Sequence, residues 1–116
     1  MKVQLQQQTL RLRISEHELA QLLAGGEVSN LTRITPTVAY SFNLCLTKEV
    51  EPTLVGSSGC WWFHLPQRPL QDYVATLPNR HGLEFPINVG QNETLQVEIE
   101  VDVRDSVRSR GGKKRD

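Results

Sequence analysis

The sequence predicts an α+β fold: a mostly antiparallel, curved sheet of five to six strands with two helices, the curvature extending as far as a half-barrel. Two observations predict it. Apolar and polar residues alternate in several stretches, which is typical of strands with one buried face. Two other stretches carry helix-start signals, and this combination favours an antiparallel sheet with helices on one face.

The first predicted element is a strand that runs directly into a helix. The stretch "TLRLRI" (9–14) places its aliphatic side chains on one face and Arg11 and Arg13 on the other. Ser15 and Glu18 then have the spacing of a capping box, in which each side chain bonds the backbone N–H of the other residue. A stripe of leucines follows, and a Gly-Gly pair ends the helix.

The remaining elements follow from the same two patterns. Pro69 suits the first turn of a second helix over 69–77. Pro86 cannot donate to a strand ladder, so its strand is expected at a sheet edge or at a bulge. No internal repeat is visible. Further strands are expected at 37–46, 53–55, 60–65, 83–89 and 95–103.

Charge and hydropathy limit the class of protein. We expect a single α+β domain over residues 1–105 and a basic, disordered tail over residues 106–116. Residues 1–105 hold 8 basic and 12 acidic side chains, net −4, whereas the tail holds 5 and 1, net +4. The acidic body argues against nucleic acid as a partner. Nucleic-acid binding through the basic tail would require an affinity that salt weakens.

The location follows from the apolar segments. The longest apolar runs are only a few residues, so neither a transmembrane helix nor a membrane partner is expected. The N-terminus lacks the apolar core of a secretory signal, which predicts a cytoplasmic protein.

Motifs for catalysis, metals and cofactors are missing from the sequence. Two cysteines without ligand spacing, Cys45 and Cys60, predict free buried thiols and no zinc site. His17 and His81 are expected on the surface. There is no phosphate-binding loop, dinucleotide fingerprint or nucleophile elbow, so we assign no catalytic residue, no metal and no cofactor.

A row of acids lies on the last predicted strand. "LQVEIEVDV" places Glu98, Glu100 and Asp102 on one face, about 7 Å apart. The E-x-E pattern resembles the metal-binding signature of triphosphate tunnel enzymes, but that family has a lysine where Asp102 stands, and uses the motif early in its chain. The other interpretation pairs the acids with Arg11 and Arg13, if the first predicted strand lies beside the last.

A second unusual stretch is "CWWF", because neighbouring strand residues point to opposite faces. Trp61 goes with the more apolar set and is expected in the core. Trp62 then lies either under the chain's own cover or exposed beside His64, where it would be an anchor for a partner or ligand.

At "TLRLRISEHELAQLLAGGEVSN" and "LQVEIEVDV" the chain resembles a family of small bacterial proteins of unassigned function. Those chains also begin with a Leu/Arg strand, a Ser-capped helix and a Gly-x-Val exit, and end on an acidic strand. They often close with a V-E-K-D-F-like segment, where this chain has Val101-Asp102-Val103-Arg104-Asp105. The resemblance covers the N-terminal third better than the middle. It implies a freestanding bacterial domain and brings no activity with it.

These observations lead to two functional hypotheses. The first is a non-catalytic domain that binds an unknown protein partner or forms a homodimer, through the face around Trp62 and His64. The second is a phosphate- or metal-ligand-binding protein, or a hydrolase, with a charged β-sheet pocket. Its lining would be Arg11, Arg13, Glu98 and Glu100.

Overall fold

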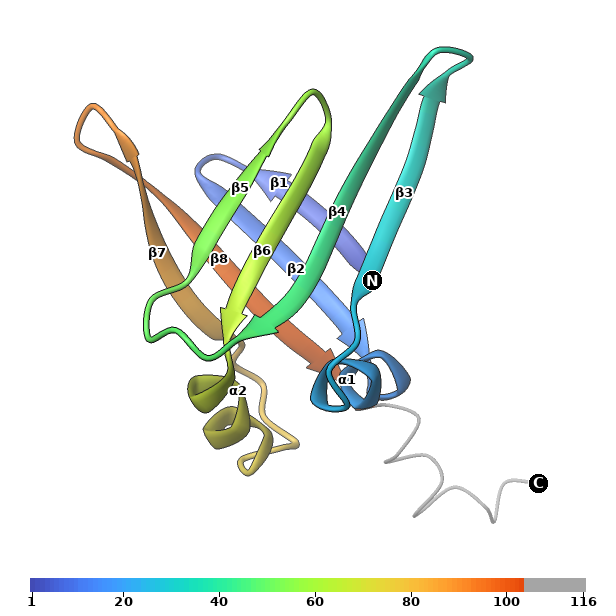
Figure 1. Cartoon of the computed structure of the whole chain (residues 1–116). Coiled ribbons are helices and arrows are strands. Elements are labelled where there is room, and N and C mark those ends of the chain that lie inside the picture. The colour runs from blue at the N-terminus through green and yellow to red at the C-terminus, as the bar shows by residue number, and fades with distance from the viewer. Residues whose placement is uncertain (104–116) are drawn as a thin grey trace.

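The computed structural model describes residues 1–103, and in that range eight strands and two helices form a two-layered domain (Figure 1). The predicted tail, 106–116, lies outside the described residues. No helix within residues 1–103 has the length and apolar character needed to cross a bilayer. The elements are β1 (Lys2–Gln6), β2 (Thr9–Ser15), α1 (Glu16–Leu23), β3 (Val28–Thr35), β4 (Val38–Thr47), β5 (Thr53–Ser57), β6 (Cys60–Pro66), α2 (Gln67–Val74), β7 (Leu83–Gly90) and β8 (Glu93–Asp102).

The strands form two sheets of four, ordered β1-β2-β8-β7 and β3-β4-β6-β5. The α+β class is confirmed, but the single curved sheet of five to six strands is wrong, and the eight described strands close no barrel. Each sheet has antiparallel outer pairs and a parallel central pair, β2 with β8 and β4 with β6, so both sheets are mixed. The helices lie at one end of the two layers, not across a sheet face (Figure 1).

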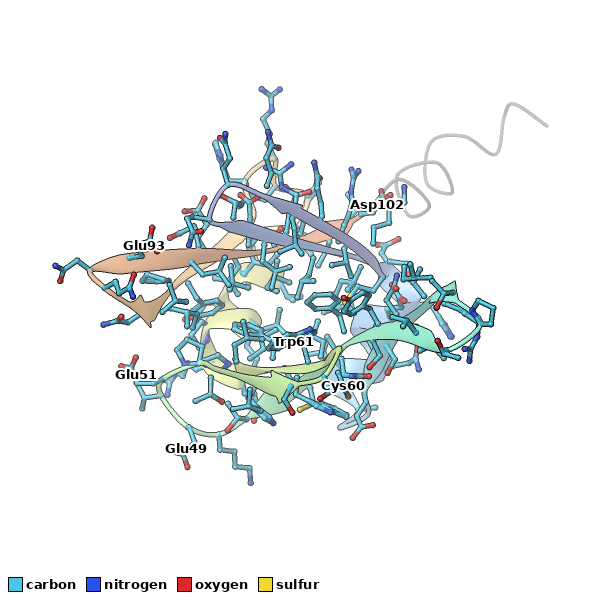
Figure 2. The ribbon with its side chains drawn as sticks, turned by 90° about the horizontal axis from the view of Figure 1, so that it is seen from above. Glu49, Glu51, Cys60, Trp61, Glu93 and Asp102 are labelled. Atoms are coloured by element: carbon cyan, nitrogen blue, oxygen red, sulfur yellow. The ribbon has the colours of Figure 1, made fainter. Side chains whose placement is uncertain are left out.

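The core lies between the two sheets. Inward side chains of the central strands, such as Leu12 and Ile99 in one sheet and Leu44 and Phe63 in the other, are almost fully buried. Seen from above, the side chains of the two layers meet in this space, and Trp61 points into it (Figure 2). The predicted position of Trp61 on the core side of its strand is therefore confirmed.

Helix α1 has both predicted ends. The Glu18 N–H donates to the Ser15 hydroxyl over 3.1 Å, and the Ser15 N–H donates to the Glu18 carboxylate over 2.9 Å. At the other end the N–H groups of Gly25 and Gly26 donate to the carbonyls of Leu22 and Gln21, which is a Schellman motif. Gly25 has a φ of +92°, a value that glycine adopts without strain.

Helix α2 begins two residues earlier than predicted. It starts at Gln67 after Pro66, so Pro69 lies in the third helical position. Proline is tolerated there because the first-turn N–H groups have no partner inside the helix. The expectation for Pro86 is confirmed, since β7 is an edge strand.

Two strands were not predicted, β1 and β3. The turn between β1 and β2 consists of Gln7 and Gln8, which have φ values of +41° and +62°. Such left-handed pairs suit tight hairpins, but they are usually Asn-Gly or Gly-Gly, so Gln-Gln gave no turn signal. β3 is mostly exposed, and its apolar residues alternate too weakly to mark a buried face.

The order of the elements contains an internal repeat. The segment β1-β2-α1 matches β5-β6-α2 at an offset of 51 residues, so Lys2 corresponds to Thr53 and Ser15 to Pro66. The segment β3-β4 matches β7-β8 at an offset of 55, and even the strand irregularity at Arg33/Thr35 recurs at Asn88/Gly90. Each half thus contributes one hairpin to each sheet, and the two halves are related by a pseudo-two-fold axis.

The repeat is invisible in the residue letters. Across the matched elements only Leu19 and Leu70 are identical. What persists is the inward apolar character: Leu12 corresponds to Phe63, and Leu44 corresponds to Ile99. The repeat is therefore a property of the structure that the sequence does not show, because packing requires apolar character at these positions and not a particular side chain.

Candidate functional site: a cleft between the sheets

The first predicted site is a charged ladder on the outer face of the β1-β2-β8-β7 sheet. β2 and β8 pair in a register that places Arg11 opposite Glu98 and Arg13 opposite Glu100. The Arg11 Nε lies 2.6 Å from Glu98 Oε1 and 3.5 Å from Glu100 Oε2, and the Arg13 Nε lies 3.8 Å from Glu100 Oε1. The predicted adjacency of these two strands and the pairing of their charges are confirmed.

These charges compensate one another. The hydrogen bond to Glu98, together with the charges of Glu98 and Glu100, raises the pKa of Arg11. Gly82 leaves room for both glutamates, because a Cβ at that position would lie 2.8 Å from the Glu98 Cγ. A polar hollow of about 200 Å³ adjoins Arg11. Within residues 1–103 no group of three or more His, Cys, Asp or Glu side chains is arranged to hold a metal ion.

The second predicted site is on the outer face of the other sheet. The Trp62 and His64 rings are stacked with their centroids 6.5 Å apart, and His64 Nδ1 lies 3.0 Å from the Thr53 hydroxyl. Both side chains are partly buried. By the repeat, Trp62 corresponds to Arg11 and His64 to Arg13, so the two predicted sites occupy equivalent positions on opposite outer faces.

The two cysteines and the other two histidines lie outside both predicted sites. Cys45 and Cys60 are both free. Cys60 is exposed, so its predicted burial is wrong, and Cys45 is only partly buried. Burial and the nearby Glu27 charge raise the pKa of the Cys45 thiol. His17 and His81 are exposed as expected.

A cleft with a volume of about 600 Å³ lies between the two sheets. It opens where the inner faces of the sheets separate, above the packed core. Trp61 is among its lining residues, whereas Trp62 is not. The lining comprises Val3, Leu5, Leu10, Asn30, Thr32, Tyr40, Phe42, Leu54, Trp61 and Leu95.

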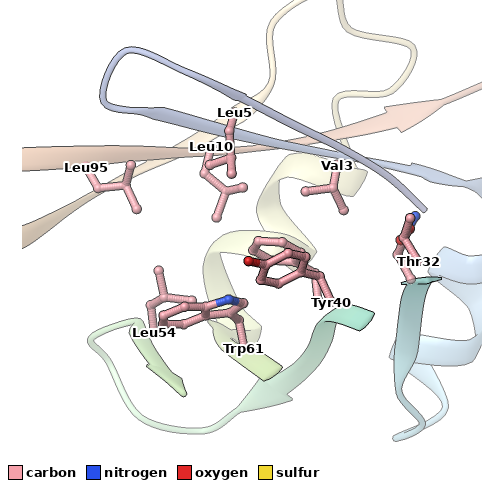
Figure 3. Close-up of a pocket in the computed structure, with 10 residues that line it drawn as sticks. Val3, Leu5, Leu10, Thr32, Tyr40, Leu54, Trp61 and Leu95 are labelled. Carbon is pink, nitrogen blue, oxygen red and sulfur yellow. The ribbon is translucent and has the colours of Figure 1, made fainter. Parts of the chain in front are cut away.

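The two walls of the cleft differ in chemistry. The wall from the β1-β2-β8-β7 sheet is wholly aliphatic. The opposite wall carries the Trp61, Tyr40 and Phe42 rings, and Figure 3 shows Trp61 and Tyr40 facing the aliphatic side chains across the opening. The outermost residues are open to solvent, since Leu5 is 64% and Tyr40 46% exposed.

Polar groups occur only on the aromatic side of the cleft. The Asn30 amide donates to the Met1 carbonyl over 2.7 Å, and the Thr32 hydroxyl donates to the Asn30 oxygen over 2.8 Å. Within residues 1–103 neither the Tyr40 hydroxyl nor the Trp61 indole N–H has a hydrogen-bond partner. Among residues 1–103, no charged side chain lines the cleft.

A comparison with protein-family models identifies the family of this chain. The model of a family of unknown function, DUF7009, matches residues 1–108. The chain belongs to DUF7009. The match spans both halves of the internal repeat, and it confirms the resemblance to a family of unassigned function. Neither the comparison with curated proteins nor the comparison with solved structures found a match.

Sequence reasoning missed the cleft in this DUF7009 member, although it placed Trp61 on the inner face. The available signal was the run of inward aromatic residues, with Tyr40 and Phe42 on one strand and Trp61 on another. Alternation identifies such residues as inward-facing but does not reveal how far apart two sheets stand. The separation of the layers is what turns part of an inner face into a cleft wall.

Proposed function

We propose that this domain is a non-catalytic binding protein that takes an apolar small molecule into the cleft between its two sheets. The observation that carries the proposal is the cleft itself, whose volume of about 600 Å³ is typical of small-molecule sites. Its lining also fits that class, because such sites are mostly apolar and aromatic with a few polar groups that orient the ligand.

The energetic argument concerns the apolar surface that the cleft leaves in contact with water. Each square ångström of apolar surface removed from water stabilises a complex by about 25 cal/mol, before the cost of association is subtracted. Leu5 and Tyr40, at 64% and 46% exposure, lie on this surface. A ligand between the sheets would cover both walls at once. Binding in the cleft therefore removes more apolar surface from water than binding on either outer face.

The charged-pocket hypothesis has weaker support. Arg11, Glu98 and Glu100 lie on an outer face, where their charges are already paired. A phosphate or a metal ion would have to separate these pairs, so the ladder offers no unbalanced charge to attract either of them. Trp62 and His64 lie on an outer face and do not line the cleft of about 600 Å³.

The test is a titration with N-phenyl-1-naphthylamine, a neutral apolar probe, followed by probe fluorescence and by calorimetry. The wild-type chain is expected to bind it at a stoichiometry of one. Val3→Trp places a large ring in the cleft and should abolish binding. Val55→Trp makes the same change at an exposed position on the opposite side of its strand from Leu54, and should leave binding intact.

A second variant is needed in case Val3→Trp does not fold. Leu5 is largely exposed, so Leu5→Asp should fold normally while placing a carboxylate beside the entering apolar ligand. Saturable binding that is unchanged in both cleft variants, or the absence of binding to the wild-type chain, contradicts the proposed function.

A further inference from the structure

We infer that the ligand of this cleft is an uncharged, flat ring system that stacks on Trp61 and Tyr40, rather than an alkyl chain. This inference rests on the proposed function and specifies its ligand class. Its basis is a difference between the two halves of the repeat. Trp61 stands where the other half has Leu10, and Tyr40 stands where the other half has Leu95.

The two walls therefore depart from the pseudo-two-fold symmetry in a consistent way, because rings on one wall correspond to aliphatic side chains on the other. Phe42 adds a third ring to the same wall, and its counterpart on the opposite sheet is Val97. Aromatic side chains gain from offset or edge-to-face contact with another ring beyond the gain from area alone. An aliphatic chain would pack equally well between two aliphatic walls. A flat ring system can use the aromatic wall for stacking and the aliphatic wall as a cover.

The polar atoms of the aromatic wall indicate how the ring system is oriented. Figure 3 shows the Tyr40 hydroxyl and the Trp61 indole nitrogen on the cleft side of their rings. With no hydrogen-bond partner among residues 1–103, they can donate to a ring oxygen or nitrogen. Thr32 adds a hydroxyl at the end of the same wall.

The charge of the ligand follows from the lining. No Lys, Arg, His, Asp or Glu side chain is among the cleft residues. A charged group inside the cleft would lose its hydration without gaining a counter-ion, which is costly. The ion-paired side chains Arg11, Arg13, Glu98 and Glu100 lie on the outer face of the β1-β2-β8-β7 sheet, away from the cleft.

The two adjacent tryptophans make the inference testable. Trp62→Phe leaves Trp61 as the only tryptophan, so its indole N–H gives a single cross-peak in a proton–nitrogen NMR spectrum. We would titrate this variant with 2-naphthol and with 1-decanol, which have the same number of carbon atoms and one hydroxyl each. The indole signal should move on saturation. After each affinity is corrected for the compound's own water-to-octanol transfer free energy, 2-naphthol should bind about fivefold to tenfold more tightly than 1-decanol.

The matched variant exchanges one wall residue for its counterpart in the other half. Trp61→Leu should remove most of the preference for 2-naphthol and leave binding of 1-decanol nearly unchanged, which a general loss of structure would not do. Tyr40 is 46% exposed, so Tyr40→Leu provides the same test at a position that folding tolerates.

The outcomes separate the inference from the proposed function. If 1-decanol binds as tightly as 2-naphthol or more tightly after the same correction, the ring-system inference is overturned while the proposed function stands. If 2-naphthoate binds as tightly as 2-naphthol, the requirement for an uncharged ligand is overturned. If neither these compounds nor N-phenyl-1-naphthylamine binds, both the proposed function and this inference fail.

Discussion

Glu18 connects a local capping motif to a long-range contact. Its carboxylate accepts the Ser15 N–H within the capping box, and it also lies 2.5 Å from the Met1 ammonium. Burial raises the pKa of this carboxyl, but the hydrogen bonds from the ammonium and from Ser15 and the ammonium charge outweigh that effect, and the net pKa is lowered. One side chain thus caps α1 and attaches the start of β1 to it.

The lowered pKa gives a pH dependence with a definite sign. Because the folded-state pKa of Glu18 lies below its unfolded value of about 4.3, the charge stabilises the fold at higher pH. That stabilisation is lost as the pH falls through the folded-state pKa. Glu18→Gln should therefore be less stable than the wild-type chain at neutral pH, and the difference should shrink in acid.

The measurement is urea unfolding of both proteins at several pH values between neutral and acidic. Glu16→Gln, in the same helical turn, is the control for a general loss of helix-start charge. A difference between Glu18→Gln and the wild-type chain that stays constant across the pH range would argue against the assigned role.

At the scale of elements, we expect the charges on β2 and β8 to favour the pairing of these two strands in this register. The register places Arg11 opposite Glu98, and a shift of one residue would place an aliphatic side chain there instead. The corresponding positions in the other sheet, Trp62 and Asn43, carry no charge. The two central strand pairs of this protein therefore have the same geometry but different outer surfaces.

A charge-exchange cycle tests this pairing. Arg11→Glu and Glu98→Arg should each destabilise the fold, because like charges then face each other across the ladder. The double exchange should recover part of the loss, and only part, since Arg11 also lies 3.5 Å from Glu100. Unfolding free energies at low and high salt would measure the coupling, which salt should weaken.

The control for this cycle is Arg68→Glu, at an exposed position of α2 outside the ladder. It should have little effect on stability and should not couple with Glu98→Arg. If the four ladder proteins show additive free energies, the charges do not act as a pair.

At the scale of the whole molecule, the repeat implies that the order of the two halves along the chain can be exchanged without changing the fold. The loop 48–52 joins the end of β4 to the start of β5. By the pseudo-two-fold relation, the end of β8 and the start of β1 have the same spatial relation. Consistent with this, Met1, Lys2 and Asp102 line one shallow hollow of about 170 Å³.

A circular permutant should therefore fold. The new chain would begin at Val50, which is 84% exposed, and end at Glu49. A linker of three glycine and serine residues would join Val103 to Met1, so that five residues separate β8 from β1, as five separate β4 from β5. Near-UV circular dichroism and the binding of N-phenyl-1-naphthylamine should match those of the wild-type chain.

A second permutant uses residues 104–116 as the linker, and a longer loop costs little extra entropy. Both permutants lose the Met1 ammonium, so they should have similar stability. If only the long-linker form folds, the ends of β8 and β1 are farther apart than the repeat implies.

The sequence by itself determined the local features. Alternation in "TLRLRI" and "LQVEIEVDV" identified the buried faces of β2 and β8, and Ser15 and Glu18 located the start of α1. These signals are readable because a strand face repeats every two residues and a helix cap needs only near neighbours. The Arg–Glu ladder followed once those two strands were assumed to be adjacent.

Only the tertiary structure decided how the strands divide into two sheets and where a cleft opens. The β1 hairpin turn used Gln7 and Gln8, which carry no turn signature, and β3 lacks a clear buried face. The choice of parallel partners for β2 and β4 depends on pairings between residues far apart in the chain. The cleft depends further on the separation of two layers, because alternation directs Trp61 inward but only the packing of both sheets leaves space in front of it.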